Sequence, residues 1–257
     1  MNLAEKIKEL HASKYKFVIV SSGGGSNAIA SLLKVPGASN TVLEAYIPYA
    51  KESLDFYLMK KPDFYASKDT SLRMAARAYS AAKKIDQESS LNHLLGVSIT
   101  ASLSTTYEKR GDHKFHIALQ TRDFSKSISC KLEKGQRTRE EEEELVTAFV
   151  VNLLAECSEL KYDYPQIPEE VVFDEVKAEK GWAELMSNKI NYVLSEDASP
   201  ELIFPGAFYP YHDGHKAMKD LAEQETGKKI FFEICIQNVD KPPISYHQIK
   251  KTVMQFN

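Results

Sequence analysis

The first 160 residues alternate between stretches with helical and with strand-like spacing of hydrophobic side chains. Leu3, Ile7 and Leu10 recur at helical intervals and predict a short amphipathic helix over residues 3–13. FVIVS (17–21) is a compact run rich in β-branched residues, which predicts a buried strand. The same criteria predict helices over residues 28–33, 52–59, 72–85 and 138–160, and strands over 41–49, 95–101, 115–121 and 126–132. The last two strands flank Arg122-Asp123 and predict a hairpin, so this segment has the mixed pattern of an α/β domain.

The pattern changes after residue 160. Residues 161–200 carry prolines and acidic residues around one predicted helix, Glu175 to Val193, and predict a linker. From Glu201 onward the pattern predicts strand, helix, strand and helix, a partial Rossmann-like βαβα unit. We therefore expect an α/β domain over residues 1–160, a linker over 161–200 and an incomplete unit over 201–257.

Composition limits the class of protein. Of the 257 residues, 43% are hydrophobic, enough for a buried core. Thirty-three basic and 36 acidic side chains leave a formal charge of −3, so neither a nucleic acid nor a membrane is an expected partner. The N-terminus lacks the apolar core of a signal peptide, and no stretch approaches the roughly 18 apolar residues of a membrane span. Cys130, Cys157 and Cys235 match neither a disulfide framework nor a metal site, so we expect a cytoplasmic protein without a bound metal.

A glycine-rich loop, Ser21 to Ser26 (SSGGGS), follows the first predicted strand and precedes a helix. Glycines allow the backbone to approach a ligand, and the N-terminus of a helix offers unpaired N–H groups to an anion. This favours Gly24, Gly25 and Ser26 as phosphate-binding residues and Ser22 as a nucleophile. The alternative, a serine that caps a tight strand–helix turn, has equal support from the sequence alone.

Several short motifs in order resemble the C-terminal domain of the CinA (competence/damage-inducible) family. Val35-Pro36-Gly37-Ala38-Ser39 sets the register, which aligns Ser22 and Tyr49 with the family serine and tyrosine and Gly25 with the first glycine of its glycine pair. Gly96 to Ala101 (GVSITA) and Gly135-Gln136-Arg137 extend the similarity over roughly residues 5–160. The resemblance implies a three-layer α/β domain with a mixed sheet and a homodimer. Active members of the family remove the amide of nicotinamide mononucleotide.

The departures from the family pattern bear on this activity. Gly24 stands where the family has threonine, Leu54 where it has lysine, and Lys51 where it has asparagine. The residues that remain as candidate catalytic groups are Ser22, Tyr49, Thr100 and Arg137. Amide hydrolysis needs an activated nucleophile and donors for the oxyanion. The domain is therefore either an amidase with rearranged helpers, such as Lys51 or Ser26, or a binding or scaffold domain.

A second motif, GAFYPYHDGH (206–215), lies between the predicted strand ELIF and a helix. Gly206 permits a tight turn, Gly214 lets the helix N-terminus come near an anion, and His212 and His215 bring imidazoles to phosphates. The string resembles the HxGH motif of the nucleotidyltransferase superfamily, although Tyr209 replaces the usual Asp or Asn. Domains of that superfamily continue to a second phosphate-binding motif. We therefore expect either that the chain, which ends at Asn257, comes from a longer protein, or that this unit packs against the first domain.

Three hypotheses for function follow. The first is a CinA-like protein that acts on a mononucleotide and hydrolyses its amide through Ser22, with Tyr49 and Arg137 binding substrate. The second is nucleotidyl transfer from Mg-ATP, which requires a complete transferase domain and leaves the first domain as a regulatory or dimerisation domain. The third is a non-enzymatic nucleotide-binding module. Because the last unit is short, we expect any activity in this chain to come from Ser22 and its neighbours.

Overall fold

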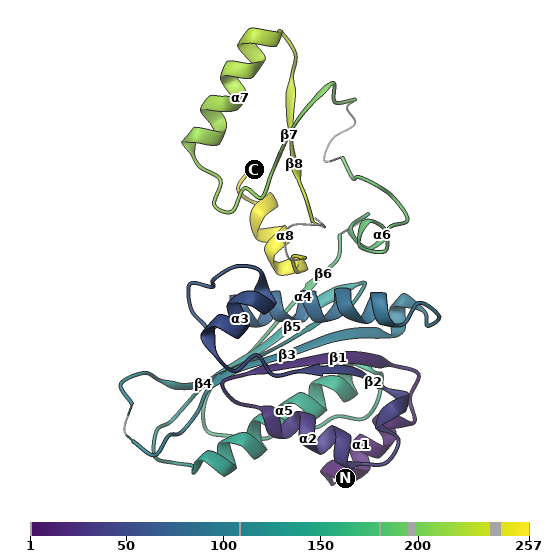
Figure 1. Ribbon diagram of the computed structural model, residues 1–257, viewed down its shortest axis with the longest axis vertical. Coiled ribbons are helices and arrows are strands. Elements are labelled where there is room, and N and C mark those ends of the chain that lie inside the picture. The colour runs from purple at the N-terminus through teal and green to yellow at the C-terminus, as the bar shows by residue number, and fades with distance from the viewer. Residues whose placement is uncertain (1, 108, 180, 195–198, 237–242, 257) are drawn as a thin grey trace.

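A six-stranded mixed sheet forms the centre of the computed structural model, which describes residues 2–107, 109–179, 181–194, 199–236 and 243–256 (Figure 1). Its order is β2-β1-β3-β4-β5-β6. The first three strands in this order are parallel, and each later strand is antiparallel to its neighbour. The strands are β1 (Lys16–Ser22), β2 (Val42–Tyr46), β3 (Leu94–Ser102), β4 (His113–Gln120), β5 (Phe124–Leu132) and β6 (Val171–Lys177).

Helices cover both faces of this sheet (Figure 1). Phe17 and Ile19 of β1 face one cluster of buried side chains, and Val18 and Val20 face the other, as the alternation of a strand buried on both faces requires. The first face packs against α1 (Leu3–His11), α2 (Ser26–Lys34) and α5 (Arg139–Cys157), and the second against α3 (Lys51–Leu58) and α4 (Lys68–Ile85). Short 3₁₀ turns, Ala38–Asn40 and Leu91–His93, precede β2 and β3. The predicted three-layer α/β architecture is confirmed.

One close helix–sheet contact explains a glycine in the sequence. A Cβ atom on Gly96 would lie 2.1 Å from the backbone nitrogen of Tyr79 and 2.3 Å from the carbonyl oxygen of Ala75. Any other residue would therefore push α4 away from β3. Glycine at position 96 therefore allows the backbones of β3 and α4 to pack directly against each other.

The helix predicted over residues 175–193 is wrong in its bounds. Residues 171–177 instead form β6, which pairs with β5 from Cys130↔Val171 to Phe124↔Lys177 and extends the sheet. The helix that follows, α6, is confined to Trp182–Met186. The acidic segment DEVK favours a helix locally, but the open edge of β5 supplies the backbone partners that select a strand.

The C-terminal elements appear in the predicted order: β7 (Leu202–Gly206), α7 (Asp213–Thr226), β8 (Ile230–Ile234) and α8 (Tyr246–Val253). β7 and β8 form a separate parallel pair. Every residue of α7 stays at least partly exposed, and this part of the chain extends away from the large sheet (Figure 1).

Helix α8 joins the two parts. Tyr246 is fully buried, stacks on Trp182 with ring centroids 6.1 Å apart, and donates its hydroxyl hydrogen to the carbonyl of Arg122. The next residue, His247, lies with Nδ1 2.7 Å from the hydroxyl oxygen of Ser125 on β5. The expectation that the C-terminal unit packs against the first domain is thus confirmed for α8. None of the helices in the described residues is long and apolar enough to span a membrane.

Trp182 gives a direct test of this junction, because it is the only tryptophan in the sequence and is 9% exposed. We expect Tyr246→Ala to remove the stacked ring, to shift the Trp182 fluorescence toward longer wavelength and to lower the free energy of unfolding by about 3–5 kcal/mol. Urea titration followed by that fluorescence measures both quantities. Tyr192→Ala is the matched control, since Tyr192 is 70% exposed and should change neither. An unshifted spectrum in Tyr246→Ala would contradict the stacking.

Candidate functional site

The carboxyl ends of the parallel strands bring together three of the residues that the sequence singles out. Ser22 ends β1 and pairs in register with Thr100 of the adjacent strand β3. Tyr49 follows the end of β2, on the other side of β1. Open α/β sheets bind ligands at this edge. Ser22 and Thr100 thus lie side by side at this edge, and Ser22 reaches Pro48, the residue before Tyr49.

Both hydroxyls are engaged with backbone carbonyls. Ser22 Oγ donates to the carbonyl oxygen of Pro48 at 2.9 Å, and Thr100 Oγ1 donates to that of Tyr65 at 2.8 Å. The residues are 7% and 2% exposed. Because a carbonyl oxygen does not take up the proton of an attacking hydroxyl, these bonds hold the loop after β2 and the segment between α3 and α4, and do not activate a nucleophile. Tyr49, in contrast, is 70% exposed.

The glycines of the SSGGGS loop serve close packing. Gly23 has φ +78°, and a Cβ atom there would lie 2.2 Å from the carbonyl oxygen of Ala101. Gly25 has φ +88° and is the N-cap of α2, which begins at the exposed Ser26. A Cβ atom on Gly24 would lie 2.8 Å from the side chain of Leu103. The loop therefore lies directly against β3 and the residues after it.

A side chain from α5 occupies the N-terminus of α2. The backbone N–H of Gly25 donates to Glu143 Oε2 at 2.8 Å, and Arg139 holds the other oxygen of that carboxylate at 2.8 Å. Arg139 also donates to the carbonyl of Gly23 at 3.1 Å. The chain's own carboxylate thus stands where a phosphate was expected. The acidic run 140–144 is visible in the sequence, but nothing in its spacing links it to the loop at Gly25.

Glu142, the neighbour of Glu143, has a similar role. It is fully buried, accepts the N–H of Ser104 at 2.6 Å and lies 2.8 Å from His113 Nδ1. It therefore fixes the loop that follows β3. Two successive carboxylates at the start of α5 close this side of the sheet edge, where a second anion would meet their charge.

Arg137 pairs with a carboxylate in the segment before β6. Its two terminal nitrogens donate to both oxygens of Glu169, at 2.5 and 3.0 Å. These bonds hold the pKa of Glu169 low, at about 2. The pair ties the start of α5 to the edge of the sheet. The predicted substrate-binding role of Arg137 stays a prediction.

The positions that depart from the CinA pattern also have defined surroundings. Leu54 is 1% exposed and belongs to the core beneath α3. Lys51 lies at the start of that helix, with its ammonium 5.7 Å from the centre of the Tyr65 ring. The carbonyl oxygen of the same Tyr65 accepts the Thr100 hydroxyl, so Lys51 and Thr100 contact one common residue.

The GAFYPYHDGH turn connects the carboxyl end of β7 with the N-terminus of α7. His212 is the N-cap of α7, and its imidazole stacks on that of His215 with centroids 3.8 Å apart and planes 23° apart. A Cβ atom on Gly214 would lie 3.1 Å from the His212 ring, so glycine leaves room for this ring. Tyr211 lies nearly parallel to His215, at 5.9 Å and 12°. The turn therefore presents two paired imidazoles at the start of a 14-residue helix.

An aromatic side chain supports this turn from below. Phe208 is 2% exposed, and a Cβ atom on Gly206 would lie 2.5 Å from its ring. Gly206 thus permits Phe208 to fold over β7. Phe208 also contacts His215 edge-on at 5.1 Å. Desolvation, followed by the neighbouring His212, lowers the pKa of His215, so its imidazole is mainly neutral at pH 7.

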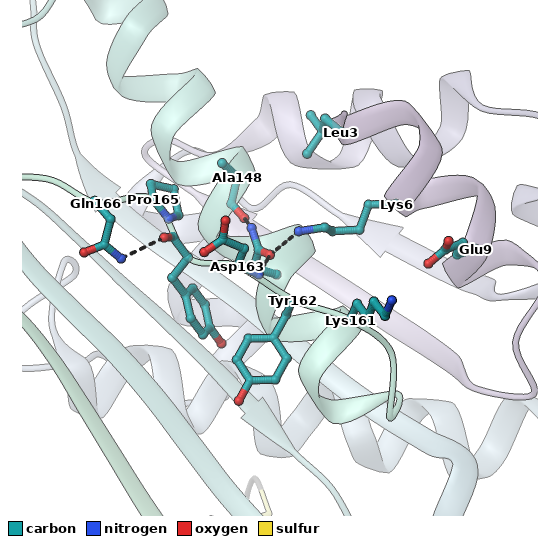
Figure 2. A pocket seen from close by; sticks show the side chains of 11 residues that line it. Leu3, Lys6, Glu9, Ala148, Lys161, Tyr162, Asp163, Pro165 and Gln166 are labelled. Carbon is teal, nitrogen blue, oxygen red and sulfur yellow. Dashed lines mark hydrogen bonds between the residues drawn. The ribbon is translucent and has the colours of Figure 1, made fainter. Parts of the chain in front are cut away.

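A groove of about 740 Å³ lies elsewhere, between α1, α5 and the segment 161–166 (Figure 2). Lys6 of α1, labelled in Figure 2, donates from Nζ to Asn152 Oδ1 on α5. None of the candidate catalytic or phosphate-binding residues predicted from the sequence lines this groove. Among the residues that the structure describes, no group of three His, Cys, Asp or Glu side chains is arranged to hold a metal ion.

Comparisons with known proteins give matches among solved structures. No protein-family model matches the chain, and no curated protein does. A competence/damage-inducible protein, CihA, from Agrobacterium tumefaciens is 16% identical, with 61% of this chain and 99% of that chain covered and a TM-score of 0.48. A competence or damage-inducible protein from Enterobacter asburiae is also 16% identical, over 61% and 94%, with a TM-score of 0.46. A CinA-superfamily protein from Enterobacter cloacae is 14% identical, over 60% and 93%, with a TM-score of 0.47.

His116, directly opposite Thr100 in the register of β4, yields a test of the sheet edge. Burial lowers its pKa to about 4, with smaller effects from Lys114 and Lys68, and Nδ1 lies 2.8 Å from Ser129 Oγ. The neutral form is thus favoured in the fold. The contribution of neutral His116 to the free energy of unfolding is complete above the unfolded-state pKa of about 6.5. It is lost as the pH falls through the folded-state pKa of about 4. We expect the loss to reach about 2 kcal/mol after allowance for partial contact with water.

Urea denaturation at pH 7.5 and pH 4.5 measures this effect. We expect the difference between the two pH values to be smaller in His116→Gln than in the unmodified chain, since glutamine keeps a polar group but does not titrate. Equal acid sensitivity of the two proteins would show that other groups dominate.

Proposed function

We propose that this chain binds the phosphate groups of a nucleotide at the turn 206–215, that the chemistry of this turn is nucleotidyl transfer, and that the first domain is a CinA-like scaffold. The observation that carries the proposal is the stacked pair His212 and His215 at the exposed N-terminus of α7. It follows a strand of a parallel pair, and parallel strands direct ligands to their carboxyl ends. Sequence, local geometry and helix electrostatics therefore favour the same position.

Two features of the turn suit an anion. The first turn of α7 contributes a partial positive charge, and its His215 N–H is bonded to the carbonyl oxygen of His212 at 2.9 Å. The imidazoles lie beside it, and an approaching phosphate favours their protonated forms, which reverses the direction in which His215 is shifted in the free protein. Binding should therefore take up protons near neutral pH.

The contrast with α2 strengthens this assignment. Glu143 already accepts the N–H of Gly25 there. A phosphate at that loop would have to displace the carboxylate and leave Arg139 with one partner fewer. At α7, the cap is the imidazole of His212, and an approaching anion stabilises the protonated form of an imidazole.

Nucleotidyl transfer requires little covalent chemistry from the protein. An oxygen of the acceptor attacks the α-phosphorus of a nucleoside triphosphate, a new P–O bond forms, and the bond to pyrophosphate breaks. His212 and His215 would stabilise the negative charge that develops on the leaving phosphates. Magnesium would arrive bound to the triphosphate and screen its charge.

Binding of ATP in the presence of magnesium, measured by calorimetry, tests the proposal. We expect His212→Ala and His215→Ala each to weaken binding about tenfold, the effect of losing one charge-assisted hydrogen bond. Ser22→Ala should bind as the unmodified chain does. Unchanged affinity in both histidine variants would contradict the site. Binding without release of pyrophosphate when a mononucleotide is added would favour a binding module over a transferase.

Deamidation of nicotinamide mononucleotide at Ser22 is the competing function. Its support is the pairing of Ser22 with Thr100 at the carboxyl edge, with Lys51 nearby, in a segment that resembles an amidase family. The hydrogen bond from Ser22 to Pro48 weighs against it.

An ammonia-release assay with nicotinamide mononucleotide separates the two functions. Because the Ser22 hydroxyl donates to a carbonyl, we expect no release above a Ser22→Ala control. Release by the unmodified chain that disappears in Ser22→Ala but persists in His215→Ala would place the activity in the first domain instead.

A further inference from the structure

The turn 206–211 contains one strained residue. Phe208 has φ +46°, in the left-handed region that a residue with a bulky side chain rarely adopts. Such a conformation persists when surrounding contacts hold it, and it often marks a functional turn. The contacts that hold this one come from the end of the chain.

Gln255 bridges the turn from both sides. Its amide nitrogen donates to the carbonyl oxygen of Phe208 at 3.1 Å, and its amide oxygen accepts the N–H of Tyr211 at 2.9 Å. Only a side chain with both a donor and an acceptor at its tip completes these two bonds at once. The adjacent Phe256 packs on Tyr211 with centroids 4.7 Å apart.

Tyr211 passes this restraint to the histidines. Its ring lies parallel to the imidazole of His215, which in turn stacks on His212. The order of contact is therefore Gln255, Tyr211, His215, His212. A displacement of the Tyr211 backbone would move the imidazole against which the phosphate is proposed to bind.

The geometry points to Gln255 as a positioning residue that sets the orientation of the histidine pair for the phosphates of a nucleoside triphosphate. This inference rests on the proposed function for its ligand, but not for its structural part. Gln255 follows α8, the helix that packs on the large sheet through Tyr246 and His247. The turn is thus held by the residues that directly follow the helix joining the two parts of the chain.

The test uses the full chain and two readouts. Gln255→Leu removes both hydrogen bonds while keeping similar bulk. Gln224→Leu is the matched control, because Gln224 is an exposed glutamine of α7 in the same unit. The first readout, without ligand, is the NMR titration of the His212 and His215 imidazoles. The second is the dissociation constant for ATP with magnesium.

We expect Gln255→Leu to move the His215 titration toward that of an ordinary histidine and to raise the dissociation constant about tenfold, with Gln224→Leu unchanged in both. Unmoved imidazole signals in Gln255→Leu would overturn the inference, whatever the affinity. Moved signals in a chain whose unmodified form does not bind ATP would support the positioning role and contradict the proposed function.

Gln255→Glu keeps the inference testable if the leucine variant fails to fold. A protonated carboxyl group can donate to Phe208 as the amide does, and an ionised one cannot. We expect its affinity, relative to that of the unmodified chain at the same pH, to be lower at pH 7 than at pH 4, which lies below the ordinary glutamate pKa of about 4.3. A ratio that does not change with pH would overturn the role of the donated bond.

Discussion

The seating of α8 on the large sheet is the contact on which the rest of the C-terminal part depends. Tyr246 lies buried against Trp182, and its hydroxyl bonds the β4–β5 turn through Arg122. Beyond α8, β7 and β8 form only a two-stranded pair, and every residue of α7 remains at least partly exposed. A pair of strands with one exposed helix buries little apolar surface of its own. The order of this unit therefore comes largely from the helix that anchors it.

Two helices, α2 and α7, begin after a glycine-containing turn. Their N-termini show that such a turn does not by itself determine whether a ligand can bind. α2 and α7 both begin after a parallel strand, and both offer the same backbone N–H groups. At α2 a carboxylate from 118 residues away satisfies Gly25, and Arg139 neutralises it. At α7 the cap is the exposed His212, whose N–H lies 3.4 Å from His215 Nδ1 in the same turn. The difference between a structural and a ligand-binding turn thus lies in the partner that the fold supplies.

Local patterns predicted most of the fold. The alternation of Phe17 to Val20 between two cores, the hairpin around Arg122-Asp123 and the order of the last four elements all follow from periodicity and turn residues. β6 did not, because DEVK suits a helix and only the free edge of β5 makes it a strand. Glu143 and Gln255 could not be assigned either, since their partners are distant in sequence and no spacing rule links them. The sequence identified the groups capable of binding or catalysis. The structure shows which of them already have a hydrogen-bond partner within the fold.

This distinction changes where chemistry is expected in the chain. The sequence favoured Ser22, since its domain is the larger and the unit of His212 is short. In the structure the Ser22 hydroxyl and the N–H of Gly25 each have an internal partner, so a substrate must first break bonds that the fold has made. The histidine pair is held more loosely, since the His212 N–H reaches His215 Nδ1 at 3.4 Å and His212 is an exposed residue at the start of α7. We therefore place the proposed anion site at this pair, beside Phe208, whose left-handed backbone conformation is held by the hydrogen bond from Gln255.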